Sequence, residues 1–262
     1  MPSITTQHGV VHFEVNGRGS PVIFLHGWLG SWGLWQETMD FLSGYYRTYA
    51  LDFWGFGESG KKSGSFTVPD FVSMVGQFME NLGINKAPLV GHSMGGTVSL
   101  SFALQNPDKV SKVVLIGSPI VGSSLALMLK LAGYPCIARL VFNMMGALKF
   151  GIRVASPLIT HEPEWSGMIE KDLSRTTLES FLLSIASLRR IDLRPKLFTN
   201  SFPVMGMYGN RDVIVHPNQW EVLRDYIPCA RIERFENAGH FIMLDEPQLF
   251  RSKLWDFLGS EN

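Results

Sequence analysis

The chain has 262 residues, of which 45% are hydrophobic, and this size and composition suit one α/β domain with a large core. Its 23 basic and 23 acidic residues are interspersed and give no net charge, which argues against a nucleic-acid partner. The two cysteines, Cys136 and Cys229, form neither a metal-binding spacing nor a disulfide framework, and residues 1–7 are polar and unlike a signal peptide. We therefore expect a cytoplasmic protein with free thiols.

Apolar strands alternate with helical segments along most of the chain. In chain order, the predicted strands cover residues 10–15, 21–25, 46–51, 87–90, 110–116, 204–208 and 230–235. Helical spacing covers residues 34–42, 68–82, 97–105, 217–226 and about 247–258. Apolar strands joined by helices predict a mostly parallel sheet that is covered by helices on both faces.

The segment from about residue 119 to 199 breaks this alternation, because it has helical spacing and no predicted strand. We therefore expect a core domain made of residues 1–118 and 200–262, with residues 119–199 inserted as a helical cap. Basic residues and Pro135 interrupt the apolar run in this segment, so no stretch is long enough for a clean membrane span. The sequence predicts no stable membrane insertion.

The predicted cap is rich in leucine and methionine, which allows two interpretations. Its apolar faces could simply pack on the sheet, or they could line an acyl pocket above the active site. Both can hold at once, because flexible methionine side chains fill irregular cavities. The candidates for the pocket wall are Leu125, Met128, Met144 and Met145.

The stretch Gly91-His92-Ser93-Met94-Gly95 lies between a predicted strand and a predicted helix. G-x-S-x-G in this context is the pattern of a nucleophile elbow, whose strained turn exposes the serine hydroxyl at the top of the sheet. The helix start also presents backbone N–H groups beside the hydroxyl, where negative charge develops during acyl transfer. Ser93 is therefore the predicted nucleophile.

A serine nucleophile needs a base to take its proton. Among the seven histidines, His240 lies in a loop directly after the last predicted strand. Active groups gather at the carboxyl ends of parallel strands, so His240 is the predicted base. His92 adjoins Ser93, but it should point away from Ser93 across the turn.

The base in turn needs a carboxylate that holds its tautomer. Asp212 follows the predicted strand 204–208 and is the predicted acid. Asp52 also follows a strand, but its glycine-rich surroundings favour a structural role, in which its carboxylate accepts hydrogen bonds from loop N–H groups.

The chain order Ser93, Asp212, His240 resembles that of the α/β-hydrolase superfamily. His-Gly-x-x-Gly at 26–30 and Asp-x-x-Gly-x-Gly-x-Ser at 52–59 extend the resemblance over almost the whole chain. It implies the α/β-hydrolase fold, with a mostly parallel central sheet, flanking helices and a helical cap insertion. It also implies an oxyanion hole formed by the backbone N–H groups of Trp28 and Met94, and a mechanism that needs no metal or organic cofactor.

Small microbial carboxylesterases, and hydrolases of meta-cleavage products, are the members that the chain resembles most. We therefore expect a serine carboxylesterase that acts on a small-molecule ester through an acyl-enzyme intermediate. The same three residues would also serve a C–C bond hydrolase of meta-cleavage diketones. A non-catalytic ligand receptor on the same fold stays open, and so does a homodimer.

Overall fold

The computed structural model describes residues 2–61 and 66–260, except for the side chain of Met145. Eight strands form one sheet in the order β1-β2-β4-β3-β5-β6-β7-β8. The strands are β1 Ser3–Thr6, β2 Gly9–Asn16, β3 Ser20–Leu25, β4 Tyr46–Leu51, β5 Ala87–His92, β6 Val110–Ile116, β7 Val204–Gly209 and β8 Arg231–Phe235. Strands β3 to β8 run parallel to one another, whereas β1 and β2 pair antiparallel at the edge.

Helices cover both faces of the sheet and divide the core into two layers. One face packs on α2 Val68–Asn81, α3 Met94–Gln105 and α10 Gln219–Tyr226. The other packs on the short turn η1 Trp32–Trp35, α1 Gln36–Leu42, α11 Ile242–Asp245 and α12 Pro247–Gly259. Successive side chains of a strand point to opposite faces, so Ile23 of β3 joins the first layer and Phe24 the second.

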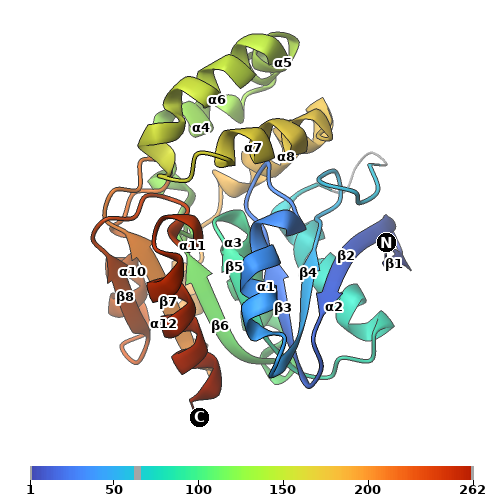
Figure 1. Cartoon of the computed structure of the whole chain (residues 1–262), viewed down its shortest axis with the longest axis vertical. Coiled ribbons are helices and arrows are strands. Elements are labelled where there is room, and N and C mark those ends of the chain that lie inside the picture. The colour runs from blue at the N-terminus through green and yellow to red at the C-terminus, as the bar shows by residue number, and fades with distance from the viewer. Residues whose placement is uncertain (1, 62–65, 261–262) are drawn as a thin grey trace.

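The predicted helical insertion lies between β6 and β7. It contains η3 Gly122–Ser124, α4 Leu127–Ala132, α5 Pro135–Asn143, α6 Met145–Ile159, α7 Trp165–Ser174, α8 Leu178–Leu188 and α9 Arg194–Leu197. Figure 1 shows α4 to α8 gathered at one end of the sheet, with α5 and α6 farthest from it. Helix α8 is anchored to the core, because the Ser180 hydroxyl donates to the carbonyl oxygen of Gly55 over 3.0 Å and the Val68 N–H donates to the Ser187 hydroxyl over 3.0 Å.

The described structure differs from the sequence-based prediction in two short elements that were missed and in one helix boundary. Strand β1 was not predicted, because Ser3–Thr6 is short and polar and gains its structure from pairing with β2. Helix α3 begins at Met94 rather than at residue 97, directly after the turn that carries Ser93. The short helix α11 was also missed, because its four residues are too few to show a helical period.

Within residues 2–61 and 66–260, no single helix is both long and apolar enough to cross a membrane. Helix α5 and residues 146–159 meet that criterion only as a pair, and the pair is bent by 89°.

Candidate active site

Ser93 occupies a sharp turn between β5 and α3, with backbone angles φ 51° and ψ −120°. Only Ser93 and Leu29 combine a side chain with positive φ in the described chain, and such strain costs on the order of 1–3 kcal/mol. The turn is held by the Ser93 N–H, which donates to the carbonyl oxygen of Ile116 over 2.8 Å. Glycine is required at position 91, because a Cβ there would lie 2.4 Å from the backbone of Gly95. The predicted elbow geometry is therefore present.

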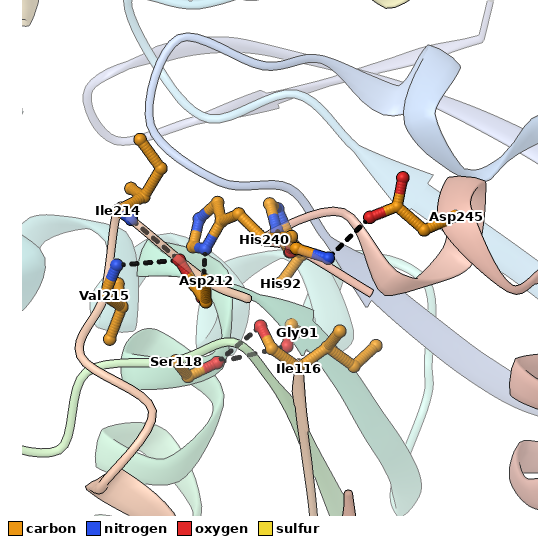
Figure 2. A network of polar contacts seen from close by, with 10 residues as sticks. Gly91, His92, Ile116, Ser118, Asp212, Ile214, Val215, His240 and Asp245 are labelled. Carbon is orange, nitrogen blue, oxygen red and sulfur yellow. Dashed lines mark hydrogen bonds and ion pairs between the residues drawn. The ribbon is translucent and has the colours of Figure 1, made fainter. Parts of the chain in front are cut away.

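His240 and Asp212 form a close buried pair after β8 and β7. The Nδ1 of His240 lies 2.7 Å from the Oδ2 of Asp212, and Figure 2 shows this contact as a dashed line. The other carboxylate oxygen of Asp212 accepts hydrogen bonds from the N–H groups of Ile214 at 2.8 Å and Val215 at 2.9 Å. These donors fix the carboxylate, so the hydrogen on Nδ1 of His240 points at Asp212 and the other ring nitrogen, Nε2, is turned away from Asp212.

The loop that carries His240 is also tied to the helical insertion, through Asp245. One oxygen of Asp245 accepts a hydrogen bond from the N–H of Gly239 at 2.7 Å. The other accepts from the Thr160 hydroxyl and the His161 N–H, each at 2.6 Å. Sequence reasoning missed this residue, because Asp245 lies inside a short helix with no motif around it.

Ser93 and His240 line the same cavity, which has a volume of about 300 Å³. The helical insertion supplies most of its apolar wall, including Ile137, Val141, Leu148, Ile152 and Phe181. The side chains with polar groups in the lining are Trp28, Ser31, His92, Ser93, Trp165, Asp172 and His240. Within the part of the chain that the structure describes, no lysine or arginine belongs to this lining.

The loop after β3 lies against Ser93. A Cβ on Gly27 would lie 3.1 Å from the Cβ of Ser93. The backbone N–H groups of Trp28 and Met94 donate to no acceptor within the described part of the chain, so both are free to bind an oxyanion. His26 shapes this loop, because its Nδ1–H donates to the Gly27 carbonyl oxygen over 2.7 Å. Burial lowers the pKa of His26 to about 4, so its ring is neutral at neutral pH.

His92 lies beside His240 and lines the cavity, a contact that the sequence-based prediction about its direction relative to Ser93 did not include. Its Nε2 lies 3.0 Å from the carbonyl oxygen of His240, and the two ring centres are 4.6 Å apart. Figure 2 shows His92 behind the His240 loop. Burial holds the pKa of His92 well below its usual value, so the ring is neutral and its Nε2–H donates to the carbonyl.

Of the four residues predicted to line an acyl pocket, two line the cavity. Leu125 is buried in the cavity wall, and Met128 lines the cavity while 71% of its area is exposed. The prediction that Met144 lines the pocket is wrong. Met144 lies at the break between α5 and α6, is 52% exposed and is absent from the cavity lining. The side chain of Met145 lies outside the described part of the structure.

Two further carboxylates, those of Asp52 and Asp172, are buried near the loop after β3. Asp52 accepts hydrogen bonds from the N–H groups of Trp32 at 2.7 Å and Glu58 at 2.9 Å, which confirms its predicted role as an acceptor for loop N–H groups. Asp172 of α7 lines the cavity and accepts a hydrogen bond from the Ser31 hydroxyl over 3.0 Å. Burial raises the pKa of Asp172 to about 6 and that of Asp52 to about 7. Sequence reasoning missed Asp172, because no motif marks it.

Across residues 2–61 and 66–260, no three His, Cys, Asp or Glu side chains gather closely enough to hold a metal ion. The described cavity therefore offers a serine, a carboxylate-bound imidazole and free N–H groups as its reactive set.

Comparisons with known proteins agree with this fold. The 2-hydroxy-6-oxo-6-phenylhexa-2,4-dienoate hydrolase of Burkholderia cepacia is 28% identical over 270 residues, covering 95% of this chain and 91% of that protein. A pimeloyl-[acyl-carrier protein] methyl ester esterase of Aliivibrio fischeri is 26% identical over 265 residues, covering 95% of this chain and 97% of that protein. The solved structure of the enol-lactonase from Burkholderia xenovorans LB400 superposes with a TM-score of 0.87 at 21% identity, over 99% of this chain and 100% of the other. The family model of the alpha/beta hydrolase fold matches residues 20–247, and the chain belongs to this family.

Proposed function

We propose that this protein is a serine hydrolase that cleaves carboxylic esters with small to medium apolar acyl groups. One observation carries the proposal. A strained serine and a histidine oriented by Asp212 line one cavity, and the rest of its wall is almost entirely apolar. Such a cavity binds an uncharged carbon chain and brings its carbonyl group to the nucleophile.

In the proposed reaction, the hydroxyl of Ser93 attacks the ester carbonyl carbon and gives its proton to Nε2 of His240. Asp212 stabilises the imidazolium that forms, and the N–H groups of Trp28 and Met94 bind the oxyanion. His240 then gives the proton to the leaving alkoxide, so the C–O bond of the ester breaks and an acyl-enzyme remains. Water, activated by His240, attacks the acyl-enzyme and releases the acid.

The charge of the cavity favours a neutral ester over an anionic substrate. Among the described residues, no lysine or arginine lines the cavity, whereas the carboxylate of Asp172 does. A substrate that carries its own carboxylate would lose hydration there without gaining a cation as a partner. The B. cepacia relative acts on a dienoate, so its similarity makes a C–C bond hydrolase the second candidate. The lining of this cavity argues for the ester.

The proposal is tested with a series of p-nitrophenyl esters from acetate to laurate, assayed beside a meta-cleavage diketone. We expect turnover of the short and medium esters and little turnover of the diketone. Faster cleavage of the diketone than of every ester would favour the C–C hydrolase. Turnover of every substrate below about one per minute, against ordinary kcat values of roughly 1–10³ per second, would instead favour a ligand receptor. Labelling by an organophosphate, compared between the native protein and Ser93→Ala, reports whether Ser93 is the reactive group.

A further inference from the structure

The outer side of the helical insertion exposes an unusual number of large apolar side chains. The six most exposed of them on α4 to α6 are Leu127, Met128, Leu140, Phe150, Val154 and Leu158, each between 60% and 71% exposed. We call these six residues the outer face. On α6, Phe150, Val154 and Leu158 follow one another at intervals of four, so they form a continuous stripe along the helix.

Helix α6 is apolar on its inner side as well. Leu148, Ile152 and Ile159 of the same helix line the cavity, while Phe150, Val154 and Leu158 point to solvent. A helix that needed only to cover the cavity would be apolar on one side and polar on the other. The second apolar stripe therefore requires a partner outside the described chain.

The charge around the outer face indicates the chemistry of that partner. Residues 119–161 contain no aspartate or glutamate, and they contain four basic residues, Lys130, Arg139, Lys149 and Arg153. Arg153 pairs with Glu170 at 2.8 Å. Lys130, Arg139 and Lys149 form no ion pair within the described residues. The surface is thus apolar and cationic together, in a chain whose net charge is zero.

The outer face also adjoins the mouth of the cavity. Met128 is 71% exposed and Leu131 is 41% exposed, yet both side chains line the cavity that contains Ser93. If the outer face is covered by an apolar partner, an apolar molecule could move from that partner into the cavity past Met128 and Leu131. It would then reach Ser93 without passing through water.

We propose that α4 to α6 dock on an anionic lipid surface and that apolar substrate passes from this surface into the cavity. Apolar side chains beside lysine and arginine are the signature of helices that lie in a membrane interface. The 89° bend between α5 and residues 146–159 suits helices that lie along a surface. A second copy of this chain fits less well, because a symmetric contact would bring the same cations together. The transfer of substrate rests on the proposed ester hydrolysis, but the docking does not.

The docking is tested by flotation of the full-length protein with vesicles of phosphatidylcholine, with and without about a third of phosphatidylglycerol. We expect binding to the anionic vesicles that weakens with salt, and little binding to the neutral ones. F150S/L158S should lose most of this binding. R139E/K149E should bind at least about 25-fold more weakly, since one charge near the surface contributes roughly fivefold. The matched control is F198S, because Phe198 is 75% exposed and lies outside the insertion helices α4 to α6.

The variants must keep the melting temperature and the activity on p-nitrophenyl acetate of the native protein, because none of the substituted residues lines the cavity. Absence of native binding to anionic vesicles would overturn the proposal, and so would an equal loss of binding by F198S. A concentration-dependent dimer that F150S/L158S dissociates, without vesicle binding, would assign the face to a second copy instead. Vesicle binding without any ester turnover would contradict the proposed function and leave the docking intact.

Discussion

The Nε2 of His92 lies 3.0 Å from the backbone carbonyl oxygen of His240, so the residue before the candidate nucleophile is joined to the candidate base. His92 ends β5, and His240 follows β8, which is separated from β5 in the sheet by β6 and β7. Because burial lowers the pKa of His92 well below its usual value, its ring is neutral near neutral pH and donates this bond through Nε2–H. We infer that His92 positions the backbone of His240 relative to Ser93.

The first prediction concerns this contact. His92→Phe keeps an aromatic ring but removes the donor, and one such hydrogen bond contributes roughly 1 kcal/mol, so we expect kcat to fall about fivefold with little change in KM. His161→Phe is the control, because His161 lies in the insertion and its ring bonds the Asn237 carbonyl oxygen and not that of His240. An unchanged kcat in His92→Phe would mean that the contact has no role in positioning the base.

The second prediction concerns the nucleophile. Ser93→Ala removes the attacking hydroxyl, so we expect kcat on p-nitrophenyl butyrate to fall on the order of 10⁴-fold or more. The circular dichroism spectrum should not change, because the bond that holds the turn comes from the backbone N–H of Ser93. A folded variant that keeps most of its activity would contradict the mechanism.

The third prediction separates two aspartates that both follow strands. Asp212→Asn places an amide against Nδ1 of His240 and favours the wrong tautomer, so kcat should fall roughly 10⁴-fold while the fold persists. Asp52 accepts two loop N–H groups, so Asp52→Asn should lower the free energy of unfolding by about 1–3 kcal/mol. Urea denaturation and steady-state kinetics of both variants measure the two effects. The assignment of the acid is wrong if Asp52→Asn, and not Asp212→Asn, abolishes turnover.

The fourth prediction concerns the pH dependence of stability. Burial raises the pKa of Asp172 from 3.8 to about 6, so between these values the folded protein holds a proton that the unfolded chain has lost. The free energy of unfolding should therefore decrease as the pH rises through this window, by up to about 3 kcal/mol from this group alone. Asp172→Asn cannot ionise, yet its amide oxygen can still accept the Ser31 hydroxyl.

Denaturation of the native protein and of Asp172→Asn, measured from about pH 4 to pH 7, checks this prediction. The variant should lose less stability than the native protein over this range. Equal losses would show that Asp172 carries no raised pKa. Asp52 is present in both proteins, so its own titration largely cancels in the comparison.

The sheet and the reactive loops were predictable from the sequence, because each depends on a local signal. Strand β6 is rich in β-branched residues, and the turn at Ser93 needs glycine on both sides. The partners that orient these groups were not predictable. Asp172 meets Ser31 over a separation of 141 residues, and Asp245 meets Thr160 over 85 residues, so only the folded insertion brings them together.

The direction of side chains in the insertion was also beyond sequence reasoning, because its helices are apolar on more than one side. Ile137 and Val141 lie four residues apart on α5 and both line the cavity. Leu140 and Met144, on another side of the same chain segment, are 60% and 52% exposed. Composition cannot tell these two stripes apart, which is why Met144 was wrongly placed in the pocket.

The last prediction concerns the length of the cavity. Each buried methylene contributes roughly 0.8 kcal/mol, so kcat/KM should rise about fourfold for each carbon over the first members of an ester series. It should then fall when the acyl chain meets the end of the cavity, because a closed wall cannot accept more volume without overpacking. Val141→Trp fills part of the wall, so it should move the optimum to shorter acyl chains and leave activity on the acetate ester nearly unchanged.

Met144→Trp is the matched control, because Met144 lies three residues away on the exposed side of the same segment and is absent from the cavity lining. Its chain-length profile should coincide with that of the native protein. The full ester series, measured as kcat/KM for all three proteins, decides between a pocket and a cap that only stabilises the sheet. In the second case Val141→Trp would lower the melting temperature and leave the optimum in place. A shift of the optimum in Met144→Trp but not in Val141→Trp would contradict the assignment of the cavity wall, because it would place the acyl chain on the outer side of the insertion.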